Sequence, residues 1–254
     1  MKPTTIPRFI LRNATALACL ISSGAVSAQP VLEEVLVTAQ KRSQNLQEVP
    51  VAVTQFSGAD LEQSGIADIF DLQVNAPGLV VSQNQTATTS NFSIRGVGTG
   101  GNNFGLESSV GLYVDGVYRA RQSSMINNLV DVESVEVLRG PQGTLFGRNT
   151  PAGAIQIGTV KPDHDNSGFV EATYGNYDLK SVKAASSLSV VPDVLALRGT
   201  VFKTERDGTV DDLNLGDNKI NDRDRWGIRL QSLWTPSEEL SQRTCTGRRC
   251  RVGR

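Results

Sequence analysis

The sequence is poor in histidine, in net charge and in long apolar runs, and each deficit excludes a class of function. It has 1 histidine in 254 residues, and 25 basic side chains nearly balance 26 acidic ones, so the formal net charge is -1. This balance argues against a surface that binds nucleic acid or an anionic membrane along its whole length. No run reaches the roughly 18 apolar residues of a spanning helix, so membrane residence would require β-structure and excludes the inner membrane as the working site.

The side-chain groupings of an active site or a metal site are also missing. The single histidine, His164, lies in the charged segment 161–166 with carboxylates as its neighbours. An isolated histidine of this kind is more often solvated than catalytic. A nucleophile, a base and an orienting group do not occur together, and the carboxylates are scattered through expected loops. We therefore predict no enzyme, no cofactor and no metal site.

The first 28 residues have the order of features of a secretory signal peptide. Basic residues precede an apolar stretch at 14–26, and this stretch ends in the small residues at 26–28. We expect cleavage after Ala28 and export from the cytoplasm. A buried amphipathic helix is the alternative, but it would not require the basic flank, short apolar centre and small-residue exit in that order.

Cysteine is scarce in the exported part of the chain. Cys19 would be lost with the signal peptide, and Cys245 and Cys250 lie in the last ten residues, so no disulfide framework holds the main body together. A lipoprotein anchor would use Cys19, but residues 16–18 match the acceptor motif poorly. The other two cysteines could bind a metal or form a small disulfide loop, although two ligands are too few for a structural zinc site.

From 48 to 162 the sequence predicts a small α+β domain with short strands. Ser57 and Asp60 are spaced as a helix capping box, and Gly65 provides a stop. Gly, Asn, Pro and Ser separate the remaining strand-like runs. The expected elements are a strand at 49–54, a helix at 57–64, a helical turn at 66–72, and strands near Val80 and at 92–95, 110–114, 132–138 and 154–157.

Beyond Pro162 apolar and polar residues alternate, which predicts antiparallel strands. The alternation fits either a soluble sheet with one buried face or a lipid-facing barrel wall, and periodicity alone does not choose between them. The apolar positions are Val182, Ala184, Leu188 and Val190, then Leu195, Leu197 and Val201, then Trp226, Ile228 and Leu230.

Two features favour the barrel wall. Trp226 and Trp234 share a face and lie eight residues apart, which is about 26 Å along a strand, or about 19 Å across a membrane when the strand is tilted. This spacing places an aromatic near each edge of an apolar band. Tight turns at 192–193 and 235–236 also alternate with a long polar segment at 206–222, as in outer-membrane barrels.

Four stretches resemble, in order, motifs of TonB-dependent outer-membrane receptors. EEVLVTA at 33–39 resembles the TonB box, FSIRG at 92–96 the central plug strand, and YVDGVY at 113–118 the next hairpin. VEVLRGPQGTLFGRN at 135–149 is similar to the signature that precedes the barrel. The resemblance runs from Glu33 to about Trp234 and implies an α+β plug domain followed by antiparallel strands of an incomplete transmembrane β-barrel.

The resemblance implies active uptake at the cell outer membrane. A scarce extracellular ligand such as an iron–siderophore or another metal chelate binds, the plug rearranges, and TonB draws on the inner-membrane proton gradient to open a path. The expected partners are the periplasmic domain of TonB, outer-membrane lipid and this ligand, and nucleic acid is not among them. The β-branched residues of the TonB box could add a strand to a partner's sheet edge; an ordinary disordered amino terminus is the alternative.

The same resemblance implies three groups of site residues. Those expected to bind TonB are Glu33, Glu34, Val35, Leu36, Val37 and Thr38. Those expected to fasten the plug to wall carboxylates are Arg95, Arg139 and Arg148, although surface exposure or a local partner such as Glu133 or Glu136 is an equal alternative. Those expected to touch the ligand are Asn102, Asn103 and Phe104, which follow a glycine-rich run at 96–101. That run is not a dinucleotide site, because no helix opens after it.

The sequence departs from the family at its carboxyl end. The family's barrel has about 22 strands, whereas we expect about four here, at 163–236. Residues 237–254 form a basic tail whose last 14 residues hold five arginines without alternation, and we interpret the tail as out of the ancestral reading frame.

The other expected segments are the signal peptide at 1–28, a flexible TonB-box segment at 29–47 and the plug at 48–162. We expect that this form cannot transport alone; a free periplasmic plug-like binding module and a soluble secreted α+β protein are the rival interpretations.

Overall fold

The computed structural model describes residues 36–37, 44–83, 90–100, 106–120, 128–209, 222–237 and 240–250. All of them belong to the unit 36–254, which is separate from the unit 1–35. The expected signal peptide and the predicted site residues Glu33, Glu34, Val35, Thr38, Asn102, Asn103 and Phe104 lie outside the described residues.

Helix α2 (Gly58–Gln63) forms where the capping box predicts it. Its N-cap Ser57 accepts a hydrogen bond from the Asp60 backbone at 3.2 Å, and the Asp60 carboxylate accepts one from the Ser57 backbone at 2.9 Å. The bond from the Ser57 backbone to its carboxylate holds the pKa of Asp60 below its usual value. The helix ends before Gly65, whose φ of 66° suits a glycine, and Leu61 turns its side chain into the core.

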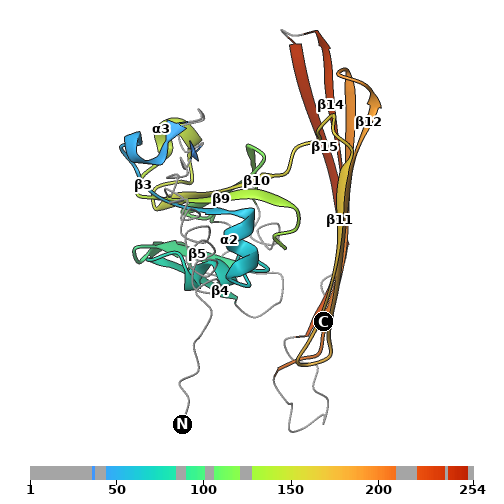
Figure 1. The fold of residues 1–254 in the computed structure, drawn as a ribbon. Coiled ribbons are helices and arrows are strands. Elements are labelled where there is room, and N and C mark those ends of the chain that lie inside the picture. Colours follow the sequence, from blue (N-terminus) through green and yellow to red (C-terminus); the bar gives the residue numbers. More distant parts are fainter. Residues whose placement is uncertain are drawn as a thin grey trace, which may run out of the picture. The chain divides into compact units, whose positions relative to one another are not determined.

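The central sheet of the first half has the order β3-β9-β10-β7-β8. Its strands are β3 (Ala52–Ser57), β7 (Val110–Val114), β8 (Val117–Tyr118), β9 (Val132–Arg139) and β10 (Gly153–Thr159). The pair β10–β7 is parallel and the other pairs are antiparallel. Figure 1 shows α2 next to this sheet. Strands β7, β9 and β10 cover the three strand-like runs that the sequence predicts there, which confirms this part of the α+β prediction.

Smaller elements complete the first half. A second sheet holds β4 (Leu79–Gln83), β5 (Ser90–Ile94) and β6 (Val97–Gly98), and a two-stranded sheet holds β1 (Leu36–Val37) and β2 (Gln44–Asn45). The short helices are η1 (Leu46–Glu48), η2 (Asp71–Val74) and α3 (Gly143–Phe146). The helical turn expected at 66–72 is thus found later in the chain, as the 3-10 helix η2. This helix ends at Val74, three residues before Pro77.

Apolar residues cover both faces of the central sheet, because neighbouring residues on a strand point to opposite faces. On β9, Val137 belongs to one buried cluster and Leu138 to the other. On β7, Leu112 and Tyr113 divide in the same way. The first cluster also holds residues of α2, η2, β4 and β5, and the second holds Val37 and residues beside η1 and α3.

The second half is an antiparallel meander in the order β11-β12-β13-β14-β15. Its strands are β11 (Ser167–Gly175), β12 (Leu179–Val191), β13 (Leu195–Arg206), β14 (Arg223–Ser237) and β15 (Leu240–Cys250), drawn from yellow to red in Figure 1. The four strands expected before 237 are present, and the tight turn falls at 192–194 as expected. Two differences stand out: β14 runs through the expected turn at 235–236, and the basic tail contributes the fifth strand, β15.

The apolar face of this meander is exposed, which decides between the two interpretations of its alternation. Leu188, Leu197, Val201, Ile228 and Leu230 are 41–60% exposed, whereas the opposite face buries the polar residues Ser187, Arg198, Thr200 and Gln231. A soluble half-buried sheet would bury its apolar face instead. An exposed apolar face opposite a buried polar face is the pattern of strands from an incomplete, unclosed barrel. In the described part of the chain, every helix is too short or too polar to span a lipid bilayer.

Candidate functional site: acids and arginines at the plug–wall interface

The buried polar face of the meander carries arginines that meet carboxylates of the first half of the chain. We call residues 44–160 the plug and strands β11–β15 the wall. Three plug carboxylates, those of Asp68, Asp115 and Asp131, form ion pairs with the wall. The wall arginines that take part are Arg198, Arg223, Arg225, Arg229 and Arg243. Because buried charges need partners, these ion pairs hold the plug against the wall.

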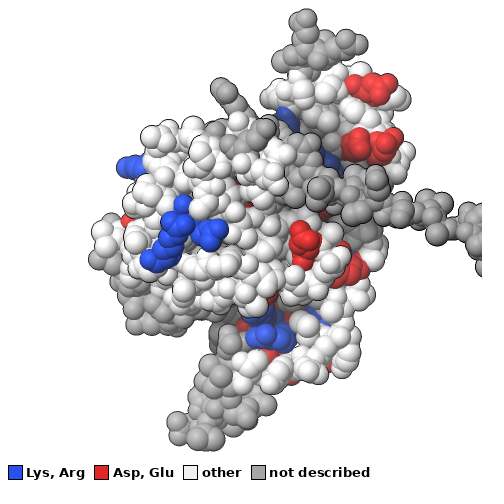
Figure 2. Space-filling model, turned by 60° about the vertical axis from the view of Figure 1, so that its left-hand side comes forward, with Lys and Arg blue, Asp and Glu red and all other residues white. Residues whose placement is uncertain are grey.

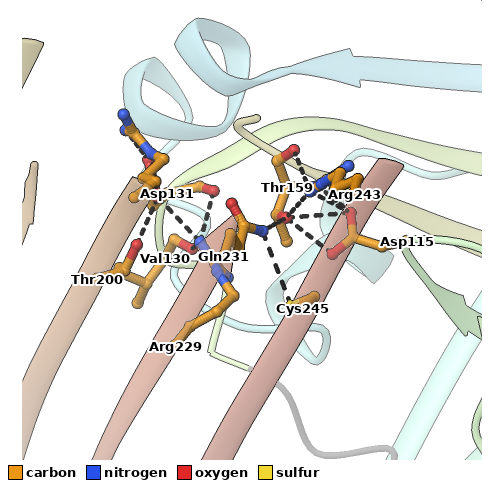
Figure 3. A network of polar contacts seen from close by, with 10 residues as sticks. Asp115, Val130, Asp131, Thr159, Thr200, Arg229, Gln231, Arg243 and Cys245 are labelled. Atoms are coloured by element: carbon orange, nitrogen blue, oxygen red, sulfur yellow. Dashed lines mark hydrogen bonds and ion pairs between the residues drawn. The ribbon is translucent and has the colours of Figure 1, made fainter. Parts of the chain in front are cut away.

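Asp131 has the largest set of wall partners. Arg198 donates from Nε to Oδ2 at 2.9 Å and from Nη2 to Oδ1 at 2.5 Å, a two-pronged contact. Thr200 donates to Oδ2 at 2.6 Å, and Arg229 donates to Oδ2 at 3.0 Å. Arg229 also donates to the carbonyls of Val130 and Asp131 at 3.1 and 2.9 Å. Figure 3 shows Thr200 and Arg229 with dashed contacts to Asp131.

The electrostatics of Asp131 follow from these contacts. Its side chain is 1% exposed and that of Arg198 is 6% exposed. Burial by itself raises the pKa of Asp131, but the hydrogen bonds from Arg198 and Thr200 and the charges of Arg198 and Arg229 outweigh burial. The pKa of Asp131 therefore lies below its usual value, and the carboxylate stays ionised at neutral pH.

Asp68 forms a second contact with the wall, at the start of β14. Its Oδ2 lies 3.1 Å from Nη1 of Arg223 and 3.2 Å from Nη1 of Arg225, and Arg225 also donates to Asn128 at 3.0 Å. The other carboxylate oxygen of Asp68 accepts the backbone N–H of Phe70 at 3.0 Å. Asp68 thus ties a local turn of the plug to the wall, and its side chain is 2% exposed.

Asp115 forms the third contact, through Thr159 and β15. Its carboxylate accepts the Thr159 backbone N–H at 2.9 Å and the Thr159 hydroxyl at 2.8 Å. Arg243 lies 3.3 Å from the same carboxylate and 2.9 Å from the Thr159 hydroxyl. Gln231 of β14 lies 2.7 Å from that hydroxyl, so two wall strands share this contact (Figure 3). The basic tail therefore contributes a side chain to the interface.

The described part of the predicted TonB box is packed against the plug. Val37 is fully buried beside Tyr113, Leu138, Phe146 and Ala154. Strand β1 pairs with β2, with Val37 opposite Gln44. Sequence reasoning expected this segment to be free for a partner, whereas here its backbone is already paired and one apolar side chain is buried.

The predicted plug fasteners lie elsewhere in the plug. Arg95 is exposed in the left-handed region with φ of 54°, and Arg139 ends β9. Arg148 is 85% exposed and pairs with Glu107 of the plug at 3.7 Å. Their predicted contact with wall carboxylates stays a prediction. In the described residues, the carboxylates that cross this interface belong to the plug and the arginines to the wall, the reverse of the expected polarity.

Sequence reasoning missed the wall arginines, although a signal for them is present. Arg198, Arg225 and Arg229 fall on the face of β13 and β14 that alternates with the apolar positions. A cation on the buried side of a strand requires an acid in front of it. Figure 2, in contrast, shows basic and acidic residues in separate small groups on a largely uncharged face of the molecule.

Comparison with protein families identifies the plug. Residues 45–154 match the model of the TonB-dependent Receptor Plug Domain. The chain is 34% identical to the Pesticin receptor of Yersinia pestis over 167 residues, which cover 64% of this chain and 24% of that protein. It is 30% identical to the Iron-regulated outer membrane virulence protein of Vibrio cholerae over 162 residues, or 59% of this chain and 23% of that protein. The chain thus spans about a quarter of the length of these curated relatives.

Solved structures extend the likeness beyond the plug. The ferric yersiniabactin uptake receptor FyuA from Yersinia pestis superposes with a TM-score of 0.68 at 28% identity, over 74% of this chain and 29% of that one. The ferripyoverdine receptor of the outer membrane of Pseudomonas aeruginosa gives a TM-score of 0.70 over 84% of this chain and 27% of that one, and at 17% identity it supports the fold alone. The chain therefore contains, at 45–154, a domain that matches the TonB-dependent Receptor Plug Domain, and the antiparallel wall strands that follow it resemble those of the solved receptors.

Proposed function

We propose that the chain serves in TonB-energised uptake of a scarce ligand, an iron–siderophore or a similar metal chelate, at the cell outer membrane. The observation that carries the proposal is the division of the wall into an exposed apolar face and a buried polar face that holds the plug. This division suits a wall between lipid and a plugged lumen. A solved relative named for ferric yersiniabactin uptake supports an iron chelate as the ligand class.

We propose that residues Glu33 to Thr38 are the coupling segment and bind TonB by strand addition. Strand β1 already pairs with two residues of β2, so the backbone at Leu36 and Val37 can form a ladder. A two-residue pairing is short, and exchange of β2 for the edge of a partner sheet requires few new side-chain contacts. Burial of Val37 supports a resting position against the plug, from which the segment leaves to bind TonB.

The remaining predicted sites belong to the same proposal. Asn102, Asn103 and Phe104 are proposed to touch the ligand. Arg95, Arg139 and Arg148 are proposed to meet wall carboxylates. Export through a signal peptide cleaved after Ala28 would deliver the chain to the periplasm and from there to the outer membrane.

Strand addition is tested by Val37→Pro, with the periplasmic carboxyl-terminal domain of TonB as bait in a pull-down. Proline removes the backbone donor of Val37 and should abolish capture. Val37→Thr keeps the donor and the β-branched shape and should be captured like the unchanged chain. Equal capture of the proline variant would refute coupling by strand pairing.

A further inference from the structure

The inner face of the wall, taken by itself, carries more basic than acidic side chains. Residues that alternate with the exposed apolar row point inward, and their ionisable members include Glu171, Lys183 and the five arginines that contact the plug. Glu171 and Lys183 pair with each other at 3.1 Å. The five arginines take their carboxylate partners from the plug. These five arginines are therefore neutralised by carboxylates of the plug.

These arginines are spread along the wall. Arg223, Arg225 and Arg229 follow one another on β14, and Arg243 of β15 lies opposite Leu233. The ten residue steps from 223 to 233 span about 33 Å at about 3.3 Å per step along the strand. A tilted strand of this length covers most of the roughly 30 Å hydrocarbon thickness of a bilayer. The cations thus form a row that runs from one end of the wall toward the other.

We propose that rearrangement of the plug withdraws Asp68, Asp115 and Asp131 and leaves these arginines as a cationic track, so that the ligand that passes is an anionic metal chelate. The inference rests on the proposed uptake function and names the charge of its ligand. An arginine in a poorly solvated lumen is costly without an anion in front of it. An anionic chelate replaces the departing carboxylates one after another, whereas a neutral chelate gains nothing from the same row.

The middle of the track offers the best place for an anion. Arg198 and Arg229 approach one carboxylate of the plug from two strands, and Thr200 adds a hydroxyl donor. Two guanidinium groups and a hydroxyl around one point match the oxygen-rich surface of a catecholate or carboxylate chelate. The carboxylate of Asp131 holds this place in the structure described here.

The test neutralises the plug acids and measures chelate binding by the full chain in detergent micelles. The probes are the ferric complex of a hexadentate tris-catecholate, which is trianionic, and that of a hexadentate tris-hydroxamate, which is neutral. Asp131→Asn and the triple variant Asp68→Asn, Asp115→Asn, Asp131→Asn should bind the trianionic probe roughly tenfold or more tightly than the unchanged chain, because they free the arginines from their carboxylates. Binding of the neutral probe should not change.

Two further variants make the result specific. Arg198→Gln and Arg229→Gln, added to Asp131→Asn, should remove the gain, whereas Glu133→Gln, a plug acid away from the wall arginines, should give none. If the triple variant unfolds, labelling of arginines with phenylglyoxal, read by mass spectrometry, replaces the binding measurement. Arg198 and Arg229 should be protected from phenylglyoxal in the unchanged chain and should react with it in Asp131→Asn. Equal affinity of folded Asp131→Asn and unchanged chain for the trianionic probe, or equal labelling, overturns the proposal.

The anion test is independent of TonB. If Val37→Pro still binds TonB, the coupling mechanism fails while the cationic track stands. If TonB binding behaves as proposed and the acid variants gain no affinity for the anion, the track fails alone.

Discussion

At the scale of single residues, the plug–wall interface depends on carboxylates that are buried together with their cations. Asp131 is the extreme case, since its 1% exposed side chain has two arginines and a threonine as partners. Desolvation makes such a pair a weak source of net stability, but removal of one member leaves the other charged and unpaired. The cost of breaking the contact is therefore much larger than the benefit of forming it.

We expect Asp131→Asn to lower the free energy of unfolding by about 3–5 kcal/mol, because Arg198 would keep its charge in a buried place without a carboxylate. Glu133→Gln, two residues further along the chain, is the matched control. It breaks a half-exposed pair with Lys161 at 3.3 Å, and exposed pairs contribute about 0–1 kcal/mol. Urea unfolding of the full chain in detergent measures both changes. Similar losses in the two variants would contradict the special role of Asp131.

The depressed pKa of Asp131 also predicts how the contact depends on pH. Its folded pKa lies below the unfolded value, so its contribution to stability is complete above about pH 4 and is lost as the pH falls through the folded pKa. The difference in melting temperature between the unchanged chain and Asp131→Asn should be constant from pH 7 to about pH 5 and shrink below about pH 4. A difference that grows on acidification would show that the pKa is raised instead.

At the scale of elements, the sequence predicted what local residues determine. Ser57, Asp60 and Gly65 lie within nine positions and define α2 without help from the rest of the chain. Strand β7 matches its predicted run because short apolar runs between turn residues have few other conformations. The parallel pairing of β10 with β7 was not predicted, because the two strands lie about 40 residues apart and local pattern says nothing of partners.

The interface was less predictable than the fold for the same reason. Asp131 and Arg198 are 67 residues apart, and Asp68 and Arg225 are 157 apart. Alternation could show that Arg198 and Arg225 face inward, but not which acid each one meets. Strand β15 shows another limit: its residues do not alternate, yet the free edge of β14 offers backbone hydrogen bonds to any extended segment.

Within β10, Gly153 is a position where the fold leaves no room for a side chain. Its φ is 153°, and an added Cβ would collide with the Leu138 carbonyl oxygen and lie 2.8 Å from Ile94 Cδ1. Gly153→Ala should lower the free energy of unfolding by about 2–4 kcal/mol, the sum of backbone strain and overpacking. Gly143→Ala is the control, because nothing lies within 4 Å of its added Cβ. Thermal unfolding of both variants distinguishes them, and a neutral Gly153→Ala would contradict this packing.

At the scale of the whole molecule, the wall exposes apolar surface that it does not cover by itself. An apolar row crosses the outer face, with one residue from each of four neighbouring strands: Val170, Ala184, Val201 and Ile228. The row ends at β15, whose outward residues next to β14 include Gln242, Thr244 and Thr246. The meander also leaves β11 and β15 as edges within the described residues. An apolar face between two edges favours association in water.

We therefore expect the full chain to associate or aggregate in detergent-free buffer, while a plug fragment of residues 29–161 stays soluble and at least partly folded. The plug buries its apolar residues in its own two clusters, whereas the wall places Leu197, Ile228 and Trp226 outside. In hydrocarbon, an open meander would leave edge backbone groups unpaired at several kcal/mol each, so insertion as a monomer is also disfavoured.

Size-exclusion chromatography of the full chain and the plug fragment, with and without detergent, tests this expectation. Detergent should shift the full chain to a smaller size and leave the plug fragment unchanged. As a matched control, Leu197→Thr, Val201→Thr and Ile228→Thr together place strand-favouring β-branched side chains on the outer face but make it polar, which should reduce association without detergent. A monodisperse, monomeric full chain in plain buffer would mean that the apolar face is covered within the molecule, and the assignment of that face to lipid would then be wrong.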